Sequence, residues 1–311
     1  MVATRFRAFF VPTMDEQLSL FVRLTSLRIW KRRFVLYRIW FENLVGYVLR
    51  AGAKRFRVGV VGDFVHFQGS KLEKARHFKV SSLAIVFEPY VNDQLYDRVL
   101  IWEPFGRIEP SERTQAGINA RMGKINKAAL DELQQKVFGN SLVIDPMTYA
   151  EPFLEKDGGT SEGGGHTANH TPLIVHTKPL EQIKSDSIYV RLIDNFNDGG
   201  YVDYRLYVCN GNVQMQCCRY VLVRRFATQS AGSLTKKIDR LSRFFSDEEI
   251  EKIKTYVSAL KLDYGELDVL RDNSSNNLFI VDVNNTPYGD FRKVGFSRRA
   301  ISAMYREVFF T

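Results

Sequence analysis

Residues 15–50 alternate hydrophobic and polar positions with the period of a helix. Apolar side chains recur every three or four positions without a proline, and the pattern ends near Gly46 or Gly52. Basic residues, among them Lys31 and Arg32, fill other positions. The sequence therefore predicts an amphipathic, basic helix. Two interpretations stay open: a core helix with a solvated basic face, or a helix that docks on an anionic membrane surface or a protein partner.

From Arg57 the period becomes that of strands. Short apolar runs beginning at Arg57, Ser82 and Arg98 are bounded by turn-forming residues, which is typical of buried strands. A short helix over 69–79 would complete a small α/β unit. The glycines from Gly59 to Gly62 lack a full dinucleotide-binding motif, so close packing of a strand explains them better.

In the rest of the sequence the pattern predicts helices between strands. We expect a helix over 126–138, a strand from Ser141 that Pro146 ends, and a glycine-rich stretch over 157–165. Further strands are expected to begin at the following residues: Pro172, Ser187, Tyr204, Val213, Gly265 and Leu278.

Local signals set two boundaries within this second half. Asn210 and Gly211 predict a tight hairpin turn, because both residues tolerate positive φ. Ser246 followed by Glu249 has the spacing of a capping box and predicts the start of a helix over 246–260. The order of elements predicts a mixed fold, α/β first and then α+β with mostly antiparallel strands.

Charge and composition narrow the function classes. The chain has 311 residues, 45% of them hydrophobic, and a net charge of +9. Residues 1–57 hold 12 Lys and Arg against 3 Asp and Glu, so the whole excess lies there. A nucleic-acid-binding domain is therefore not expected.

The cysteines and the apolar runs bear on the compartment. Three cysteines are too few for a disulfide framework, and no 18-residue apolar run indicates a membrane span, so we expect a cytoplasmic protein. Cys217 and Cys218 are neighbours on one expected strand, where alternation points them to opposite faces. A buried structural role is expected for them.

Two expected strands near the C-terminus carry the candidate chemistry. Asp268 lies in one, and Asp282 and Asn284 lie two positions apart on the next, hence on one face. Two carboxylates and an amide oxygen are hard ligands of the kind that Mg²⁺ takes beside nucleotide phosphates. The alternative is that Asp282 and Asn284 only stabilise the turn that follows them.

These strands and the order of motifs before them resemble the ATP-grasp superfamily. The run from Gly265 to Asp268 and the run from Asp282 to Pro287 are similar to the family's "G-x-x-D" and "E-x-N-x-x-P" strands. Asp203-Tyr-Arg205, followed by Arg219, is similar to its "D-x-R" strand and arginine-bearing strand. The resemblance covers roughly residues 110–295.

The resemblance implies an ATP site. Asp268, Asp282 and Asn284 would hold Mg²⁺. The strand with Arg191 and Leu192 resembles the hinge whose backbone holds adenine, with Asp194 at the ribose. Lys156, before the glycine-rich stretch, resembles a phosphate-contacting lysine.

Other lysines compete for phosphate roles. Lys124 resembles the family's second, more N-terminal phosphate lysine. Lys127 is an alternative to Lys124, and Lys178 is a third candidate near the hinge.

Two positions depart from the family pattern. Asp282 stands where most members have Glu, which makes bidentate bridging of two ions less certain. Glu266 stands where some amide-forming ligases have an arginine. The arginine that polarises the acyl phosphate must then come from elsewhere, with Arg205, Arg219 and Arg225 as candidates.

The resemblance implies four segments and one reaction. The segments are a basic helical segment (1–56), a small α/β domain (57–110), a first ATP-grasp lobe (111–190) and a second lobe (191–311). The reaction is ATP- and Mg²⁺-dependent ligation through an acyl phosphate, joining a small-molecule or peptide carboxylate to an amine. The alternatives are a phosphotransferase of the same fold and a catalytically inactive nucleotide-binding protein.

Overall fold

The described part of the chain lies within one compact unit, Lys54–Thr311. Four predicted features fall outside the described residues: the basic helix over 15–50, Lys124, the glycine-rich stretch from residue 158 onward, and Arg225. The computed structural model describes residues 55–75, 84–92, 94–102, 117–122, 127–157, 174–185, 187–223, 233–287 and 296–310.

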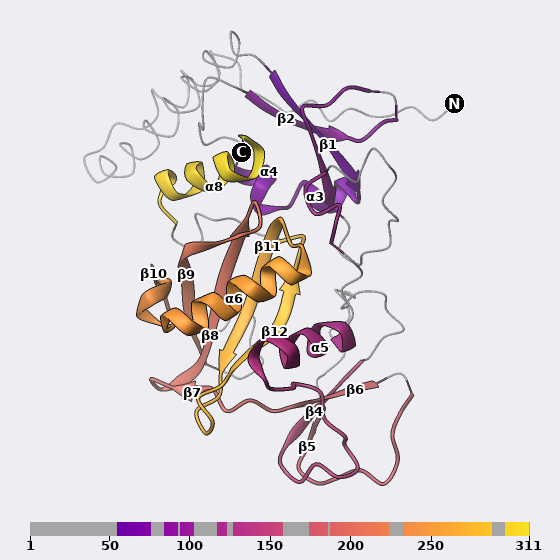
Figure 1. Cartoon of the computed structure of the whole chain (residues 1–311), viewed down its shortest axis with the longest axis vertical. Coiled ribbons are helices and arrows are strands. Elements are labelled where there is room, and N and C mark those ends of the chain that lie inside the picture. Colours follow the sequence, from indigo (N-terminus) through magenta and orange to yellow (C-terminus); the bar gives the residue numbers. More distant parts are fainter. Residues whose placement is uncertain are drawn as a thin grey trace, which may run out of the picture. The chain divides into compact units, whose positions relative to one another are not determined.

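The largest sheet among the described residues is antiparallel and has six strands (Figure 1). Its order is β10-β9-β8-β11-β12, and β7 pairs with β8 at one end. The turn between β8 and β9 holds Asn210 at φ 50° and Gly211 at φ 72°, which confirms the predicted hairpin. The strands are β7 (Phe196–Asn197), β8 (Gly200–Cys209), β9 (Asn212–Leu222), β10 (Ser233–Arg240), β11 (Tyr264–Arg271) and β12 (Leu278–Asn284).

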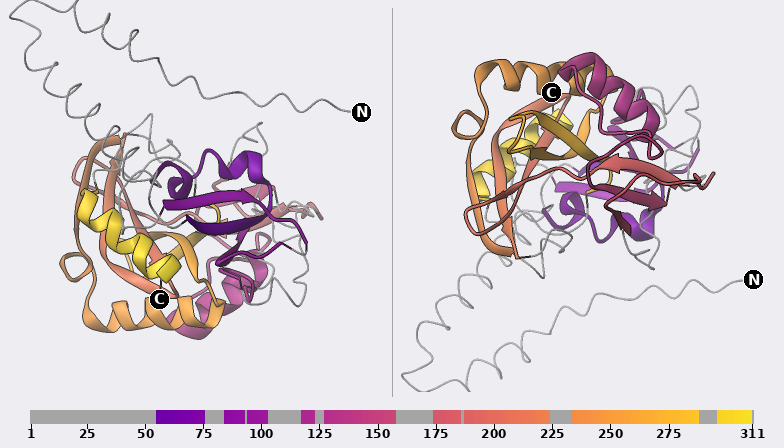
Figure 2. Two further views of the ribbon diagram at one scale, coloured as in Figure 1. Left: turned by 90° about the horizontal axis from the view of Figure 1, so that it is seen from above. Right: turned by 90° about the horizontal axis from the view of Figure 1, so that it is seen from below.

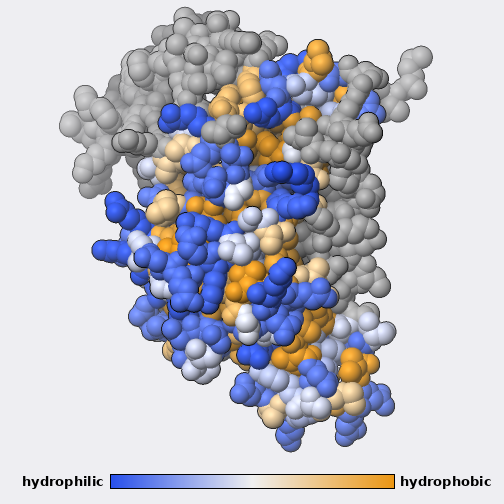
Figure 3. Space-filling view, in the orientation of Figure 1, coloured by the Kyte–Doolittle hydropathy of each residue, from blue (hydrophilic) through white to orange (hydrophobic). Residues whose placement is uncertain are grey.

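Helices α5 (Lys127–Phe138) and α6 (Asp247–Leu260) share one hydrophobic core with this sheet. The predicted capping box of α6 is confirmed, since the Ser246 hydroxyl accepts from the Glu249 amide at 3.2 Å and the Glu249 carboxylate accepts from the Ser246 amide at 2.8 Å. Figure 3 shows a largely hydrophilic surface where α6 crosses the front in Figure 1, as an amphipathic helix produces. The short 3₁₀ helix η2 (Leu241–Arg243) precedes α6.

The other face of the sheet packs on α8 (Arg298–Phe310) and on a small α/β unit. Figure 2 shows α6 and α8 on different sides of the six-stranded sheet. The small sheet is parallel, with the order β2-β1-β3. Its elements are β1 (Arg55–Gly62), α3 (Phe64–Phe67), α4 (Lys71–Ala75), β2 (Ala84–Pro89) and β3 (Arg98–Trp102).

Gly59 on β1 bears out the packing interpretation. A Cβ there would lie 3.0 Å from ring atoms of both Tyr90 and Tyr96, so a larger residue would displace an aromatic side chain. Cys217 and Cys218 behave as alternation predicts, because Cys217 joins the core under α6 and Cys218 joins the core under α8. The architecture is mixed α and β, as predicted.

A third sheet has the order β5-β4-β6 and is antiparallel. Its strands are β4 (Phe153–Asp157), β5 (Ile174–His176) and β6 (Ser187–Arg191). The predicted strand from Ser141 to Asp145 is wrong: only Val143 forms a bridge, with Val190. The reason is Asp131 on α5, whose Oδ1 takes the amides of Leu142 and Val143 away from a ladder.

No helix in the described ranges is long and apolar enough to span a membrane.

Candidate functional site

Strand register assembles the site on the six-stranded sheet. Arg205 on β8 lies directly opposite Asp268 on β11, and Asp268 lies directly opposite Asp282 on β12. Two residues away along these strands, Glu266 lies opposite Asn284 on the same face. Directly opposed residues share a face and have Cβ atoms about 5 Å apart. The three predicted metal ligands are therefore neighbours on one face.

Arg205 and Asp268 form a two-pronged ion pair. The guanidinium donates from Nε to Oδ1 at 2.7 Å and from Nη2 to Oδ2 at 2.8 Å. Its Nη1 lies 3.3 Å from Oε2 of Glu266. Burial opposes the charge of Arg205, but the two carboxylates outweigh burial and hold its pKa well above the ordinary value. Arg205 is thus a fixed cation beside the row of acids.

Lys71 on α4 completes this network from the small α/β unit. Its ammonium pairs with Oε1 of Glu266 and lies 5.2 Å from the centre of the Tyr207 ring. Both partners of the pair are 2% exposed. Burial lowers the pKa of Lys71, and the Glu266 carboxylate opposes that shift. Glu266, which departs from the family pattern, is therefore neutralised by a lysine 195 residues earlier in the chain.

Asp282 pairs with a different cation, Lys127, the first residue of α5. Lys127 Nζ donates to Oδ1 of Asp282 at 2.7 Å and lies 3.4 Å from the carbonyl of Val281. The side chains of Lys127 and Asp282 are 30% and 49% exposed. Burial raises the pKa of Asp282, but the charges of Lys127 and then Lys156 and Arg205 outweigh it, so the net shift is downward. Asp282 is held ionised.

Lys156 on β4 brings a second ammonium group to the same place. Burial lowers the pKa of Lys156 to about 8, the nearby charge of Lys127 adds to the shift, and Asp282 opposes it. Glu155, one position earlier, points to the other face of its sheet, where it accepts from Lys184 at 2.6 Å and Ser187 at 3.0 Å. Alternation along β4 thus turns Lys156 toward Asp282.

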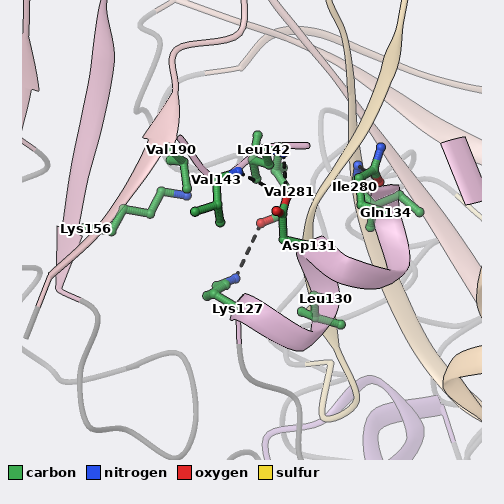
Figure 4. A pocket seen from close by; sticks show the side chains of 10 residues that line it. All are labelled: Lys127, Leu130, Asp131, Gln134, Leu142, Val143, Lys156, Val190, Ile280 and Val281. Atoms are coloured by element: carbon green, nitrogen blue, oxygen red, sulfur yellow. Dashed lines mark hydrogen bonds between the residues drawn. The ribbon is translucent and has the colours of Figure 1, made fainter. Parts of the chain in front are cut away.

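A pocket opens beside these two lysines. Figure 4 shows Lys127 reaching in from α5 and Lys156 from β4, over apolar side chains of β6 and β12. Its other polar groups belong to Asp131, which accepts from the Ser141 hydroxyl, and to Gln134, which donates to the carbonyl of Leu278. The lining residues are Lys127, Leu130, Asp131, Gln134, Leu142, Val143, Lys156, Val190, Ile280 and Val281.

Asn284 is ordered by the turn that follows β12. Its Oδ1 accepts from the amide of Thr286 at 3.0 Å. The Thr286 hydroxyl also donates to Oδ1, at 3.5 Å, a long contact whose lone pair a metal ion could take instead. The turn interpretation of Asn284 and the ligand interpretation are therefore compatible.

The donor set fits a hard divalent cation. Asp268 and Asp282 supply carboxylate oxygens, and their side chains are 26% and 49% exposed, open enough for a cation that keeps several waters. Asn284 adds a neutral oxygen on the same face. No cluster of three His, Cys, Asp or Glu side chains is found in the described ranges, so the fit rests on two carboxylates and the amide.

Asp203 lies on the same face of β8 as Arg205. Burial and the nearby charge of Asp268 raise the pKa of Asp203 to about 7, and Arg205 opposes the shift. The carboxyl accepts from the Asn195 amide group at 3.1 Å. Asp203 thus changes its charge near neutral pH.

The other predicted residues lie apart from this row. Arg219 pairs in register with Tyr204, on the opposite face from Arg205, and its guanidinium contacts Asp198. Lys178 is exposed just after β5. Among the described residues, neither of them forms a hydrogen bond or ion pair with Asp268 or Asp282.

The predicted hinge uses its amide groups within the protein. Arg191 donates its backbone N–H to the carbonyl of Leu142 at 2.9 Å, and Leu192 donates to that of Pro152 at 3.2 Å. Asp194 is exposed and its amide donates to Asp272 at 3.1 Å. An adenine ring in this place would therefore have to use carbonyl groups of the hinge.

Two residues of the site had weak or no sequence signals. Lys127 could be found only as an alternative to Lys124, through its place at the start of the predicted helix. Lys71 carried no signal, because a single lysine in a short helix does not reveal a buried partner in a distant strand.

No family model matches this sequence, and neither does any curated protein. Solved structures do show a likeness. The VanG D-Ala:D-Ser ligase from Enterococcus faecalis matches with TM-score 0.49 and 11% identity over 83% of this chain and 99% of that one. The D-alanine–D-alanine ligase from Bacillus anthracis matches with TM-score 0.47 and 10% identity over 83% and 97%. The ATP-grasp ligase PsnB, complexed with a minimal precursor, matches with TM-score 0.46 and 13% identity over 82% and 99%.

The chain is similar to ATP-grasp ligases. All three TM-scores are below 0.5 and all three identities are below 15%, so this likeness does not by itself assign a function.

Proposed function

We propose that this protein is an ATP- and Mg²⁺-dependent ligase of the ATP-grasp type that joins a carboxylate to an amine. One observation carries the proposal: the register of β8, β11 and β12 sets Arg205, Asp268 and Asp282 side by side, with two lysines beside Asp282 at a pocket. Carboxylates next to a pair of lysines are what a metal-bound triphosphate needs, since the metal ion and the phosphates then both find partners.

The proposed roles follow from charge and position. Lys127 and Lys156 would contact the phosphates. Asp268, Asp282 and Asn284 would hold Mg²⁺. When bound, Mg²⁺ would neutralise charge on the β- and γ-phosphates. Lys127 replaces Lys124 as our candidate for the N-terminal phosphate lysine, because its ammonium lies 2.7 Å from Asp282.

Arg205 is the best candidate for the arginine that stabilises the acyl phosphate. It lies on the face of the metal acids, whereas Arg219 lies on the other face of the sheet. Its guanidinium is held by two carboxylates and needs no reorganisation when negative charge develops nearby. A fixed dipole or charge of this kind stabilises a transition state better than a mobile one.

The proposed reaction has two steps. An oxygen of the substrate carboxylate forms a bond to the γ-phosphorus of ATP while the bond to the β-phosphate bridge breaks, and ADP leaves. The amine then attacks the acyl carbon, inorganic phosphate leaves, and the amine loses a proton to solvent or to a nearby base. The residues of the site act by positioning and by charge, because phosphoryl transfer leaves little covalent work to side chains.

Trapping the intermediate tests this reaction. The full chain is incubated with ATP, Mg²⁺ and a panel of small-molecule and peptide carboxylates, with hydroxylamine in place of the amine. We expect a hydroxamate and stoichiometric ADP with at least one carboxylate, and none with Asp268→Asn. A stable phosphoester without hydroxamate would instead indicate a phosphotransferase, and ATP binding without turnover would indicate an inactive relative.

A further inference from the structure

Asp268 and Asp282, the two carboxylates of the proposed metal site, each form an ion pair with a basic side chain of this protein. Arg205 holds both oxygens of Asp268, and Lys127 holds Oδ1 of Asp282. The two pairs differ in how many contacts hold the cation and in how exposed it is. Arg205 is also tied to Glu266 and is 19% exposed, whereas Lys127 makes its contacts from the first residue of α5 and is 30% exposed. Lys127 is therefore the cation that can leave.

A divalent cation on Oδ1 of Asp282 would compete with Lys127 in this position. A magnesium ion lies about 2.1 Å from its oxygen ligands. The ammonium lies 2.7 Å from Oδ1, so the ion and the ammonium would stand as like charges within a few ångströms of each other. Coordination of metal through Oδ1 is therefore stronger once Lys127 has moved away.

The pocket supplies a reason for Lys127 to move. Lys156 lines the same pocket as Lys127, so a second ammonium group lies near the pair that Lys127 forms with Asp282. The three side chains together carry one excess positive charge. A phosphate group entering the pocket meets that excess and offers Lys127 a stronger partner than Asp282.

We propose that Lys127 is a gate on the metal site: it closes on Asp282 in the free protein and transfers to a nucleotide phosphate, so that metal binds after the nucleotide and not before. This inference rests on the proposed function. It assigns Lys127 two successive partners and gives the site an order of binding. It also keeps the carboxylates of the free protein from capturing a divalent cation without substrate.

Metal titration of the full chain without nucleotide tests the gate directly. Mn²⁺ serves as the probe, and free Mn²⁺ is counted by electron paramagnetic resonance for the wild type, Lys127→Met and Lys136→Met. Lys136 is an exposed lysine on the last turn of the same helix and serves as the matched control. We expect Lys127→Met to bind Mn²⁺ at least tenfold more tightly than the wild type, and Lys136→Met to match the wild type.

Two further measurements locate the effect. The double variant Lys127→Met with Asp282→Asn should lose the gain, which places it at Asp282. After subtraction of the Mn²⁺ that ADP chelates in a titration without protein, ADP should tighten Mn²⁺ binding at least tenfold in the wild type and much less in Lys127→Met. An unchanged nucleotide-free Mn²⁺ affinity in Lys127→Met, or an equal gain in Lys136→Met, would overturn the gate.

Failure of the gate is separable from failure of the proposed function. The gain in Lys127→Met is measured without nucleotide and therefore tests the gate whether or not ADP binds. Absence of ADP binding by the wild type, with and without metal, would overturn the proposed function.

Discussion

Arg205 on β8 donates two parallel hydrogen bonds to Asp268 on β11, one from Nε at 2.7 Å and one from Nη2 at 2.8 Å. Such a fork fixes both the position and the plane of the guanidinium, which lysine cannot reproduce. Because Arg205 and not Arg219 lies on the face of the metal acids, the two arginines should respond differently to the same substitution.

Replacement of each arginine by lysine measures that difference. Arg205→Lys keeps the charge and loses the fork, and we expect ATP turnover to fall about 100-fold, the loss typical of one transition-state contact. Arg219→Lys should stay within about threefold of the wild type, because its partner Asp198 is an exposed residue away from the site. Steady-state ADP release checks both. The reverse ranking of the two variants would move the catalytic arginine to Arg219.

The buried pair of Lys71 and Glu266 makes a prediction about stability. Lys71→Met leaves a buried carboxylate whose remaining cation is shared with Asp268, and we expect a loss of about 3–5 kcal/mol in the free energy of unfolding. The double variant with Glu266→Met removes both charges and should regain most of that loss. Urea unfolding checks the series. A double variant as unstable as the sum of the two single variants would show that the pair is not coupled.

Asp203 makes the stability depend on pH between about 4 and 7. Its pKa is raised from 3.8 to about 7, so the folded protein binds a proton that the unfolded chain has released, and stability falls as pH rises through this window. Asp203→Asn cannot ionise. We expect it to be more stable than the wild type at pH 8, by at most about 4 kcal/mol, with the difference shrinking toward pH 4. Thermal unfolding at several pH values measures this; a constant difference would contradict it.

Glu155 makes the stability depend on pH in the opposite sense, and at lower pH. Hydrogen bonds from Lys184, His176 and Ser187 outweigh burial and lower its pKa from 4.5 to about 2. Its contribution is present above pH 4.5 and is lost as pH falls toward 2. Glu155→Gln should therefore cost about 2 kcal/mol at pH 7 and progressively less below pH 4. The same pH series of unfolding curves measures this cost, and Glu151→Gln, an exposed neighbour, is the control.

The acid row could be predicted from the sequence because it depends on local rules. Asp282 and Asn284 share a face by alternation alone, and the capping box at Ser246 and the turn at Asn210 need only neighbours in the chain. What the sequence could not provide is which cation meets which acid. Lys71 meets Glu266 and Lys127 meets Asp282 through tertiary packing over 195 and 155 residues, and no local period encodes such pairs.

The strand predicted from Ser141 is likewise prevented by a side-chain contact that the sequence pattern does not reveal. The apolar run there, Leu142-Val143-Ile144, has the composition of a strand. The carboxylate of Asp131 takes two of its amides, at 2.5 and 3.1 Å, so pairing with β6 stops at the single bridge of Val143 with Val190. A side chain eleven and twelve residues away from these two amides competes for them, and hydrophobic patterning does not report such competition.

The central claim is that ATP and a divalent cation bind together at Asp268, Asp282 and Asn284 beside Lys127 and Lys156. Calorimetric titration of the full chain with ATP, in the presence and absence of Mg²⁺, tests it most directly, with Asp268→Asn and Lys156→Met as variants. The account predicts saturable binding that Mg²⁺ strengthens at least tenfold, loss of that strengthening in Asp268→Asn, and weaker binding under both conditions in Lys156→Met. Binding that is unaffected by Mg²⁺ and by both substitutions, or no binding at all, would contradict it.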